Sequence, residues 1–212
     1  MNEARPLVVK VGGGLLRDEG LAGLRRACVE VTETAARRPV LVVPGGGPFA
    51  DAVRAVDAQV GLSDDVAHLL AMQAMDQLGV LLASVFLPDA SPAAGLVVPR
   101  RLAVLGVAPA FNGRPGVPAS WSVTSDSLAV LAAAAIGADE AVLLKPVDGV
   151  LARWPSDDPP LPAITADELA ELQARGGGRA VDPYLPEAVR RTGVAVVVRM
   201  PGSLGGTRIT PR

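Results

Sequence analysis

Two apolar runs near the start of the chain are each followed by three consecutive glycines, and this repeated arrangement constrains the fold more than any other feature. The first run, PLVVKV at 6–11, precedes Gly12-Gly13-Gly14, and the second, PVLVV at 39–43, leads into Gly45-Gly46-Gly47. Uninterrupted apolar runs of this length are typical of strands that are buried on both faces of a parallel sheet. The pattern predicts an α/β protein in which two strands end in glycine turns at one edge of the sheet.

A strand, a glycine turn and a helix together form a place where phosphate can bind. Glycine lets backbone N–H groups approach phosphate oxygens, and the N-terminus of the following helix adds positive potential. A helix is expected from Leu21 to Arg37 after the first turn, and another after the second. The patterns GxxxxGK[ST] and GxGxxG are absent, so neither a P-loop nor a Rossmann fingerprint is present. Asp51, in the first turn of the second helix, is either a favourable helix-dipole charge or a ligand contact.

The stretch from Ser120 to Val150 combines the start of a helix with the end of a strand. Thr124-Ser125-Asp126-Ser127 is a helix N-cap sequence that leads into an Ala/Leu-rich run. The apolar run from Glu140 to Leu144 is too short for a helix and predicts a buried strand, which ends at Lys145. Helix N-termini and strand C-termini lie on the same edge of a parallel α/β sheet, where ligands bind. We therefore expect Asp126 and Lys145 near a ligand.

The chain uses lysine at only two positions. Of its 20 Lys and Arg residues, only Lys10 and Lys145 are lysines, and both lie at the end of a predicted buried strand. A lysine ammonium is a compact point charge, whereas the arginine guanidinium is a planar fork. A site that brings a single ammonium to a phosphate oxygen can require lysine. The alternative is that two lysines persist by chance in an arginine-biased chain.

Composition restricts the kind of protein and its partners. At 212 residues the chain is expected to form a single domain spanning 1–212. A net charge of −2 provides no basic footprint for nucleic acid. The single cysteine, Cys28, excludes an internal disulfide and fits a reducing compartment. No secretory leader and no apolar run long enough to span a bilayer is recognised, so a cytoplasmic protein without membrane contact is expected.

A long helix is predicted from Ser63 to Leu82. Met72 and Met75 lie on its apolar stripe, which favours the core or a subunit interface over a cofactor role and leads us to expect a homo-oligomer. His68, near the helix start, is the only histidine, so a histidine-based metal site is not expected. His68 is either a partly buried histidine with a satisfied hydrogen bond or a substrate contact. No metal ligands are predicted.

Two shorter helices are predicted in the last third of the chain. Thr165 is expected to cap the first, which extends to Ala174. The second is expected from Asp182 to Arg191, with Pro183 at its first position. Asp182 is either a plain N-cap or a ligand contact that follows a flexible glycine turn.

In these features the chain resembles the amino acid kinase superfamily over essentially its full length. The resemblance implies a three-layer αβα sandwich with an open, mostly parallel central sheet of about eight strands. It also implies transfer of the γ-phosphoryl group of ATP, accompanied by Mg²⁺, to a carboxylate, carbamate or phosphate. The matching pieces are Lys10 with Gly12-Gly13-Gly14, the loop from Pro44 to Asp51, Thr124-Ser125-Asp126, the strand and loop from Leu143 to Val150, and Gly206-Thr207-Arg208-Ile209.

The resemblance also implies roles for individual residues. Lys10 is assigned to the transferring phosphoryl group, Lys145 to the ATP side, and Asp126 to orienting the lysines rather than acting as a base. The nucleotide side is expected to comprise Gly12, Gly13, Gly14, Lys145, Val147, Asp148, Gly149, Val150 and Trp154. The acceptor side is expected to comprise Gly45, Gly46, Gly47, Asp51, His68, Trp121, Thr124, Ser125 and Asp182.

Within the superfamily, further motifs resemble the kinases of methanofuran biosynthesis. They are His68 with the following LLAM, the run from Trp121 to Ser127, and VDPYLP at 181–186. This resemblance implies that the small-molecule acceptor is [5-(aminomethyl)furan-3-yl]methyl phosphate, which becomes a diphosphate. The chain departs from the superfamily at Gly14, where Ser is usual, and at Lys145-Pro146, where many members have Thr-Asp.

Other functions remain open at this stage. Kinases of isopentenyl phosphate, uridylate or an amino acid have the same fold. A non-catalytic protein that binds nucleotide or an oxyanion is a further alternative, against which the retention of both lysines and Asp126 argues. An aminomethyl acceptor is cationic and requires a carboxylate, for which Asp51, Asp126 and Asp182 are the candidates.

Overall fold

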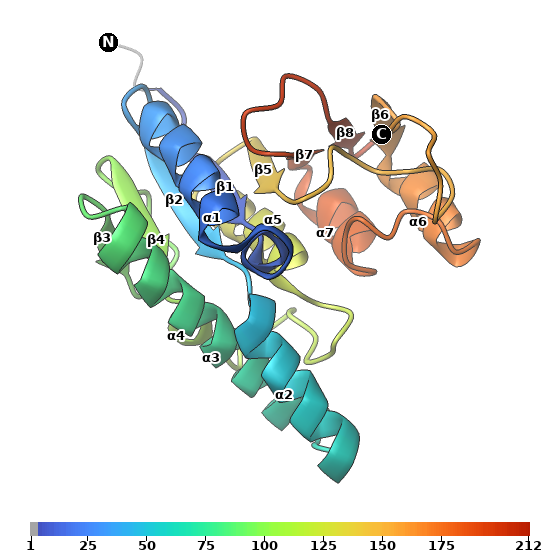
Figure 1. The fold of residues 1–212 in the computed structure, drawn as a ribbon, viewed down its shortest axis with the longest axis horizontal. Helices are drawn as coiled ribbons and strands as arrows, with labels where there is room; N and C mark the ends of the chain where they lie inside the picture. Colours follow the sequence, from blue (N-terminus) through green and yellow to red (C-terminus); the bar gives the residue numbers. More distant parts are fainter. Residues whose placement is uncertain (1–3) are drawn as a thin grey trace.

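A computed structural model describes residues 4–212 and contains one open eight-stranded sheet, in the order β3-β4-β2-β1-β5-β7-β8-β6 (Figure 1). Only β7 and β8 pair in antiparallel fashion, and the other neighbouring pairs are parallel. The predicted open, mostly parallel sheet is thus confirmed. The strands are β1 Leu7–Val11, β2 Val40–Pro44, β3 Ser91–Ala93, β4 Leu102–Leu105, β5 Glu140–Leu144, β6 Ala163–Thr165, β7 Ala195–Arg199 and β8 Thr207–Thr210.

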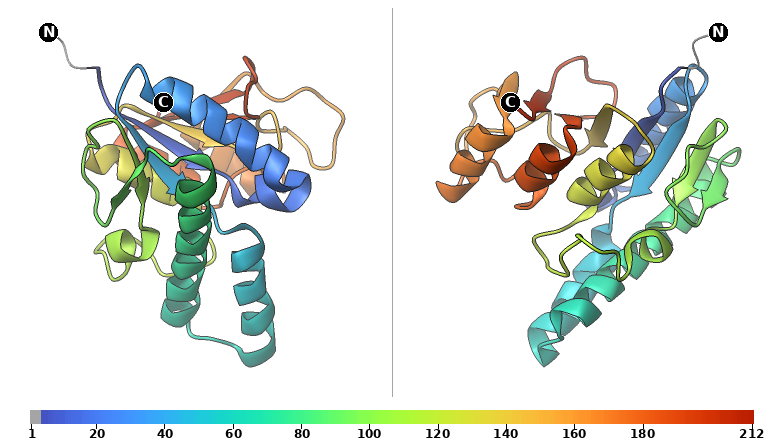
Figure 2. Two further views of the ribbon diagram at one scale, coloured as in Figure 1. Left: turned by 60° about the vertical axis from the view of Figure 1, so that its left-hand side comes forward. Right: turned by 180° about the vertical axis from the view of Figure 1, so that it is seen from behind.

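Helices cover both faces of the sheet and complete the predicted three-layer αβα sandwich (Figure 2). On one face, Val9 and Val42 pack with buried residues of α1. On the other face, Val8 and Leu41 pack with buried residues of α5 and α7. The helices are α1 Gly13–Ala35, α2 Gly47–Val60, α3 Asp64–Leu81, the short η1 Leu82–Phe86, α4 Val107–Phe111, α5 Ser125–Ala135, α6 Ala166–Ala174 and α7 Leu185–Thr192.

The order of the strands reverses at the centre of the sheet, because the strands after β1 are added first on one side of it and then on the other. β1 lies between β2 and β5, so α1, which connects β1 to β2, and α5, which leads into β5, pack on opposite faces. In open α/β sheets, ligands bind at the carboxyl ends of the strands beside such a point. Those ends carry the first glycine turn after β1 and Lys145 after β5.

The first helix begins earlier than predicted. α1 starts at Gly13 and is interrupted at Gly20, whose φ of 62° and ψ of −152° are not helical. Glycine adopts this conformation at little cost because it has no Cβ atom. The longer part of α1 after Gly20 corresponds to the predicted helix, and the shorter part before it carries Arg17 toward the sheet edge.

The boundaries of the later helices are partly as predicted. Thr165 caps α6 through a capping box with Glu168, which confirms its predicted role. Ser63 precedes α3 as expected, but its side chain makes no capping hydrogen bond. The prediction that the last helix starts at Asp182 is wrong, because α7 begins at Leu185. The Asp182 carboxylate instead accepts hydrogen bonds from the start of α5.

Helices α2 and α3 run side by side and extend beyond the sheet (Figures 1 and 2). The helical stretch Asp64–Phe86 contains an 18-residue window with a mean hydropathy of 1.5 and is long and apolar enough to cross a membrane, contrary to the expectation from sequence. Asp76, near its middle, accepts hydrogen bonds from the backbone N–H groups of Val107 and Ala108. Met72 and Met75 are buried in the core. These contacts are those of a helix packed within a globular fold.

Candidate active site

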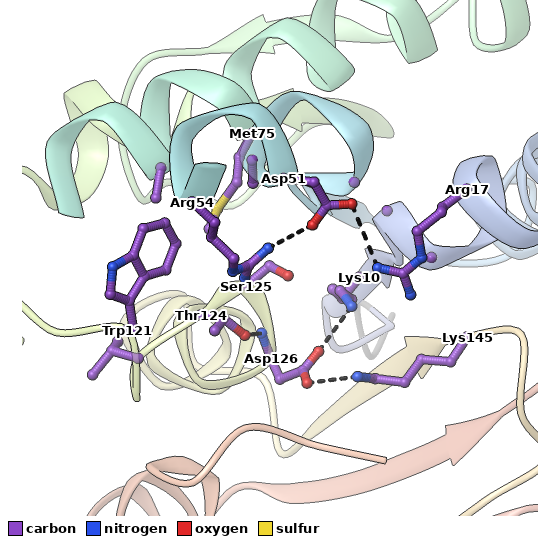
Figure 3. A pocket seen from close by; sticks show the side chains of 17 residues that line it. Lys10, Arg17, Asp51, Arg54, Met75, Trp121, Thr124, Ser125, Asp126 and Lys145 are labelled. Atoms are coloured by element: carbon purple, nitrogen blue, oxygen red, sulfur yellow. Dashed lines mark hydrogen bonds and ion pairs between the residues drawn. The ribbon is translucent and has the colours of Figure 1, made fainter. Parts of the chain in front are cut away.

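A buried lysine and a partly buried lysine, from neighbouring strands, converge on one buried aspartate (Figure 3). The Nζ atom of Lys10, in β1, lies 2.8 Å from Oδ1 of Asp126. Lys145, directly after β5, donates a hydrogen bond of 2.6 Å to Oδ2 of Asp126. The contact of Lys10 is an ion pair without an aligned hydrogen bond. The structure thus brings together the three residues that the sequence predicted as catalytic.

Burial and neighbouring charges shift the pKa values of Lys10 and Asp126 in opposite directions. Burial lowers the pKa of Lys10 to about 8, although Asp126 partly compensates by favouring the charged ammonium. Burial by itself would raise the pKa of the Asp126 carboxyl, but Lys10 and Lys145 outweigh it and hold that pKa well below its usual range. Asp126 is therefore ionised, and it fixes the two ammonium groups at the sheet edge.

Asp126 is held in place by the first turn of α5. Thr124 is the N-cap residue, and its side-chain oxygen accepts a hydrogen bond of 3.5 Å from the Asp126 backbone N–H. The predicted helix start is confirmed. Thr124, Ser125 and Asp126 all line the same cavity as the two lysines. The positive N-terminal end of α5 therefore adds to the lysine charges at this position.

Asp182 lies beneath this helix start rather than in the cavity. Its carboxylate accepts hydrogen bonds from the backbone N–H groups of Thr124, at 2.9 Å, and Ser127, at 3.0 Å, and from both hydroxyls. Its backbone N–H donates to Asp126 Oδ2 at 3.2 Å. Burial raises the pKa of Asp182 to about 6, with a further contribution from the charge of Asp126. Because four donors occupy its carboxylate, the expected contact with an acceptor amine does not fit this position.

The two glycine turns pack against each other, backbone to backbone. A Cβ atom on Gly13 would lie 2.0 Å from the Gly47 nitrogen, and one on Gly45 would lie 2.4 Å from the Gly13 nitrogen. A side chain on Gly46 would approach the Cβ of Ala50 to 2.3 Å. The glycines therefore allow the starts of α1 and α2 to meet.

A cavity of about 140 Å³ lies between the glycine turns and α5. Gly12, Gly45, His68 and Asp182 do not line it, although the sequence placed them at the site. Gly12 lies against the Leu144 carbonyl and Gly45 against Gly13. The predicted residues that do line the cavity are Lys10, Gly13, Gly14, Gly46, Gly47, Asp51, Trp121, Thr124, Ser125, Asp126 and Lys145.

His68 is buried in α3 outside the cavity. Burial lowers its pKa, while the backbone of Ser120 acts in the opposite direction. Its Nε2 atom has no hydrogen-bond partner among the residues that the structure describes. The prediction of a substrate contact is not supported by this position, and a structural contact with the segment before Trp121 agrees better with it.

Two arginines that the sequence analysis did not single out line the outer part of the cavity. Arg54 lies 2.8 Å from Asp51, and Arg17 lies 3.6 Å from the other oxygen of the same carboxylate (Figure 3). Arginine is the usual cation of this chain, so neither residue differs from its background in sequence. The i, i+3 spacing of Asp51 and Arg54 just after the glycine turn is the one signal that could have indicated them.

A second, mainly apolar cavity of about 260 Å³ lies on the other side of Lys145. It is lined by four residues that the sequence analysis assigned to the nucleotide side, Val147, Asp148, Gly149 and Trp154. Val150 does not line it and is fully buried.

The loop around this second cavity is attached to the last strand. The Val150 backbone N–H donates to the Thr207 hydroxyl at 2.7 Å, and that hydroxyl donates to the Leu161 carbonyl at 2.6 Å. Val150 therefore anchors the loop instead of contacting a ligand.

The two cavities meet at Lys145-Pro146, since Lys145 lines the first and Pro146 the second. A phosphate chain that extends from the second cavity would pass Lys145 before it reaches Lys10. In the described part of the chain, residues 4–212, no group of three or more His, Cys, Asp and Glu side chains is placed to hold a metal ion.

Comparison with known proteins agrees with this geometry. The model of the amino acid kinase family matches residues 5–199. This chain belongs to the amino acid kinase family. Members of the family transfer phosphoryl groups, so the protein is a kinase that acts on a small substrate, and ATP is the phosphate donor that the family implies.

Two relatives in the family have been assigned different acceptors. The chain is 27% identical over 154 residues to a [5-(aminomethyl)furan-3-yl]methyl phosphate kinase of Methanocaldococcus jannaschii, covering 70% of this chain and 69% of that protein. It is 29% identical over 217 residues to an acetylglutamate kinase of Acidothermus cellulolyticus, covering 79% and 73%. Among solved structures, uridylate kinase from Archaeoglobus fulgidus superposes with a TM-score of 0.73 at 24% identity, covering 96% of this chain and 99% of that one.

Proposed function

We propose that this protein transfers the γ-phosphoryl group of ATP to the phosphate of [5-(aminomethyl)furan-3-yl]methyl phosphate and forms the diphosphate. The central observation is the cluster of buried Lys10 and Asp126 with partly buried Lys145, between one polar and one mainly apolar cavity. The nature of the acceptor is supported by the relative from Methanocaldococcus jannaschii and by the motifs around Trp121 and Asp182.

In this mechanism the chain positions two phosphate groups and neutralises their charge. The adenine of ATP occupies the second cavity beside Trp154, and the triphosphate extends past Lys145. Lys10 contacts the transferring group, and its ion pair with Asp126 keeps its ammonium in position. The glycine turns add backbone donors on either side.

The chemical step requires no general base. An oxygen of the acceptor phosphate attacks the γ-phosphorus of ATP, the bond from that phosphorus to the β,γ-bridging oxygen breaks, and ADP leaves with the bond electrons. A phosphate monoester has a second pKa of about 6, so its attacking oxygen is already ionised near neutral pH. Asp126 accordingly keeps the two lysines in position and removes no proton.

Of the three candidate carboxylates, one is available to pair with an ammonium group of the acceptor. Asp182 is buried with four donors, and Asp126 is occupied by two lysines. Asp51 lines the first cavity, and 38% of its side chain is exposed. Its two partners, Arg17 and Arg54, are about half exposed and can turn to a ligand, so Asp51 is our candidate for the partner of the aminomethyl group.

An ADP-release screen over several acceptors tests the proposal. The furan-methyl phosphate with its aminomethyl group should give the highest kcat/KM, above uridylate, isopentenyl phosphate, acetylglutamate and aspartate. A higher kcat/KM for any of these four would replace the proposed acceptor while leaving the kinase assignment intact. ATP binding without turnover of any acceptor would favour the non-catalytic alternative.

We also propose that the protein acts in the cytoplasm as a homo-oligomer with no nucleic-acid partner. The net charge of −2 supports the absence of nucleic acid, and the single buried cysteine supports a reducing compartment. Val66, Val80 and Val85 expose apolar surface along α3 and η1, which supports association of subunits there. Light scattering of the purified protein measures the oligomeric state directly.

A further inference from the structure

Arg17 and Arg54 reach the same part of the first cavity from two different elements. Arg17 belongs to the short segment of α1 before the break at Gly20, and Arg54 belongs to α2. Each pairs with a different oxygen of Asp51, so one carboxylate bridges two guanidinium groups. Their side chains are 55% and 49% exposed, which leaves donor groups available to a ligand.

Arg54 is also held by an aromatic ring, in addition to its ion pair with Asp51. Its guanidinium carbon lies 4.7 Å from the centre of the Trp121 ring. The Trp121 indole N–H in turn donates a hydrogen bond of 2.7 Å to Asp57, one helical turn further along α2. Stacking on an aromatic face and pairing with a carboxylate together fix the plane of a guanidinium. Arg54 is therefore preorganised at the rim of the cavity.

The charge of this cavity favours a phosphate over a carboxylate. Four cationic side chains line it, Lys10, Arg17, Arg54 and Lys145, against the two carboxylates of Asp51 and Asp126. Lys10 and Lys145 are directed at Asp126, whereas the arginines lie beside the second glycine turn. Guanidinium groups pair with carboxylates as well as with phosphates, but the excess of positive charge favours a phosphate, which carries nearly two negative charges, over a singly charged carboxylate.

We propose that Arg17 and Arg54 form a clamp for a phosphate monoester, so that the acceptor presents a phosphate to this end of the cavity. Asp51 occupies the clamp as a stand-in anion until the phosphate displaces it. This inference rests on the proposed function, because it names the group by which that same site holds its acceptor.

The two tryptophans of the chain permit a direct binding test. Trp121 lines the first cavity and Trp154 the second, so each reports on one cavity. In a Trp154→Phe protein, the fluorescence of Trp121 is titrated with phenyl phosphate and with benzoate, which present a phosphate and a carboxylate on the same ring. In a Trp121→Phe protein, Trp154 is titrated with MgATP.

Phenyl phosphate should change the Trp121 fluorescence saturably, and benzoate should bind at least about 10-fold more weakly. Arg17→Gln and Arg54→Gln should each raise the phenyl phosphate Kd by about 10- to 100-fold, because each removes charged hydrogen bonds. Arg25→Gln is the matched control, since Arg25 also stacks on an aromatic ring, that of Phe86, but does not line the cavity. Asp51→Asn should bind phenyl phosphate at least as tightly as the parent protein, because the competing carboxylate is gone.

Unchanged phenyl phosphate binding in both arginine variants would overturn the clamp, as would equal affinity for benzoate. A loss in Asp51→Asn as large as that in Arg17→Gln would overturn the stand-in role. Failure of the kinase proposal appears separately, as a missing MgATP response of Trp154 together with absent turnover. Loss of phenyl phosphate binding in the arginine variants would support the clamp in that case as well.

Discussion

At the scale of single residues, the site depends on two ammonium groups that share the carboxylate of Asp126. The three groups in direct contact have a net positive charge, which phosphate oxygens can neutralise. Asp182, whose pKa burial raises to about 6, is ionised near neutral pH and offsets part of that charge from beneath Asp126. Because Asp126 contacts both lysines, either lysine can be removed without leaving the carboxylate unpaired.

Replacement of Lys10 by Met should abolish most turnover without unfolding the protein. Loss of one preorganised charge that acts on the transition state reduces the rate by about 10²–10³-fold. Asp126 keeps its 2.6 Å hydrogen bond to Lys145, so circular dichroism and the melting temperature should change little. A folded Lys10→Met protein with nearly normal kcat would exclude a role of Lys10 in phosphoryl transfer.

The pKa of Lys10 predicts how activity and stability depend on pH. With a pKa of about 8 in the free protein, Lys10 loses its proton above this pH, and kcat/KM should fall there. Between about 8 and 10.5 the unfolded chain retains a proton that the native protein has released, so the contribution of Lys10 to the free energy of unfolding rises with pH. In Lys10→Arg the basic limb of the kcat/KM profile should disappear. If Lys10→Arg showed the same decline of kcat/KM at high pH, the decline would arise from another group.

The sequence identified site residues that are rare in this chain or that lie in a recognisable motif better than it identified site arginines. Lys10 and Lys145 differ from an arginine-rich background, and Asp126 lies in a recognisable helix start, so all three could be identified. Arg17 and Arg54 resemble sixteen other arginines in sequence (18 minus these two). Only the packing of α1 on α2 shows that they share a carboxylate.

At the scale of elements, the contact between the two glycine turns determines how α1 and α2 meet. The sequence analysis explained these glycines mainly by phosphate binding, whereas the structure shows that four of them also lie too close to other backbone atoms to accept a Cβ atom. Helix starts that depend on local capping, such as Thr124 and Thr165, were predicted correctly. The start of α7 was not, because Asp182 pairs with residues more than fifty positions away.

Gly13→Ala should destabilise the protein strongly. Its Cβ would lie 2.0 Å from the Gly47 backbone nitrogen, and overpacking against backbone costs about 3 kcal/mol or more. Gly95→Ala is a suitable control, since its Cβ would have no atom within 4 Å. Urea unfolding of both variants measures the difference. Equal midpoints would show that the turns separate without cost.

Asp182→Ala should also reduce stability, through α5. The change leaves the backbone N–H groups of Thr124 and Ser127 without their acceptor, and buried unsatisfied donors cost about 1–3 kcal/mol each. Urea unfolding measures this loss. Asp182→Ala should retain full discrimination between amine and neutral acceptors, whereas Asp51→Asn should lose it. The opposite pattern would indicate that Asp182, and not Asp51, contacts the amine.

At the scale of the whole molecule, the sheet divides the site between two parts of the chain. The glycine turns and Lys10 come from the first fifty residues, whereas the second cavity is built from residues 146–200. The order of strands joins these parts at β1 and β5. The resemblance predicted this architecture, and the fold confirms it. The single-domain assignment for 1–212 stays a prediction, since residues 1–3 lie outside the described part.

MgATP should stabilise the whole fold because its site spans both parts of the chain. At 100 times its Kd a ligand adds about 2.7 kcal/mol, which corresponds to an increase in Tm of about 5–10 °C for a chain of this size. Differential scanning fluorimetry with MgATP, and with ATP plus a chelator, measures the shift. Trp154→Ala should reduce it at equal ATP concentration. An identical shift in that variant would place the nucleotide elsewhere.

The anchoring of the second cavity by Thr207 has a consequence for synthesis of the chain. The Thr207 hydroxyl holds Val150 and Leu161, which the ribosome adds 57 and 46 residues earlier. A nascent chain can pair β1 with β2 and bring its glycine turns together long before β8 leaves the exit tunnel. The loop that we propose to receive the nucleotide remains without its anchor during this interval. Nucleotide binding should therefore distinguish chains that have been translated through β8 from shorter ones.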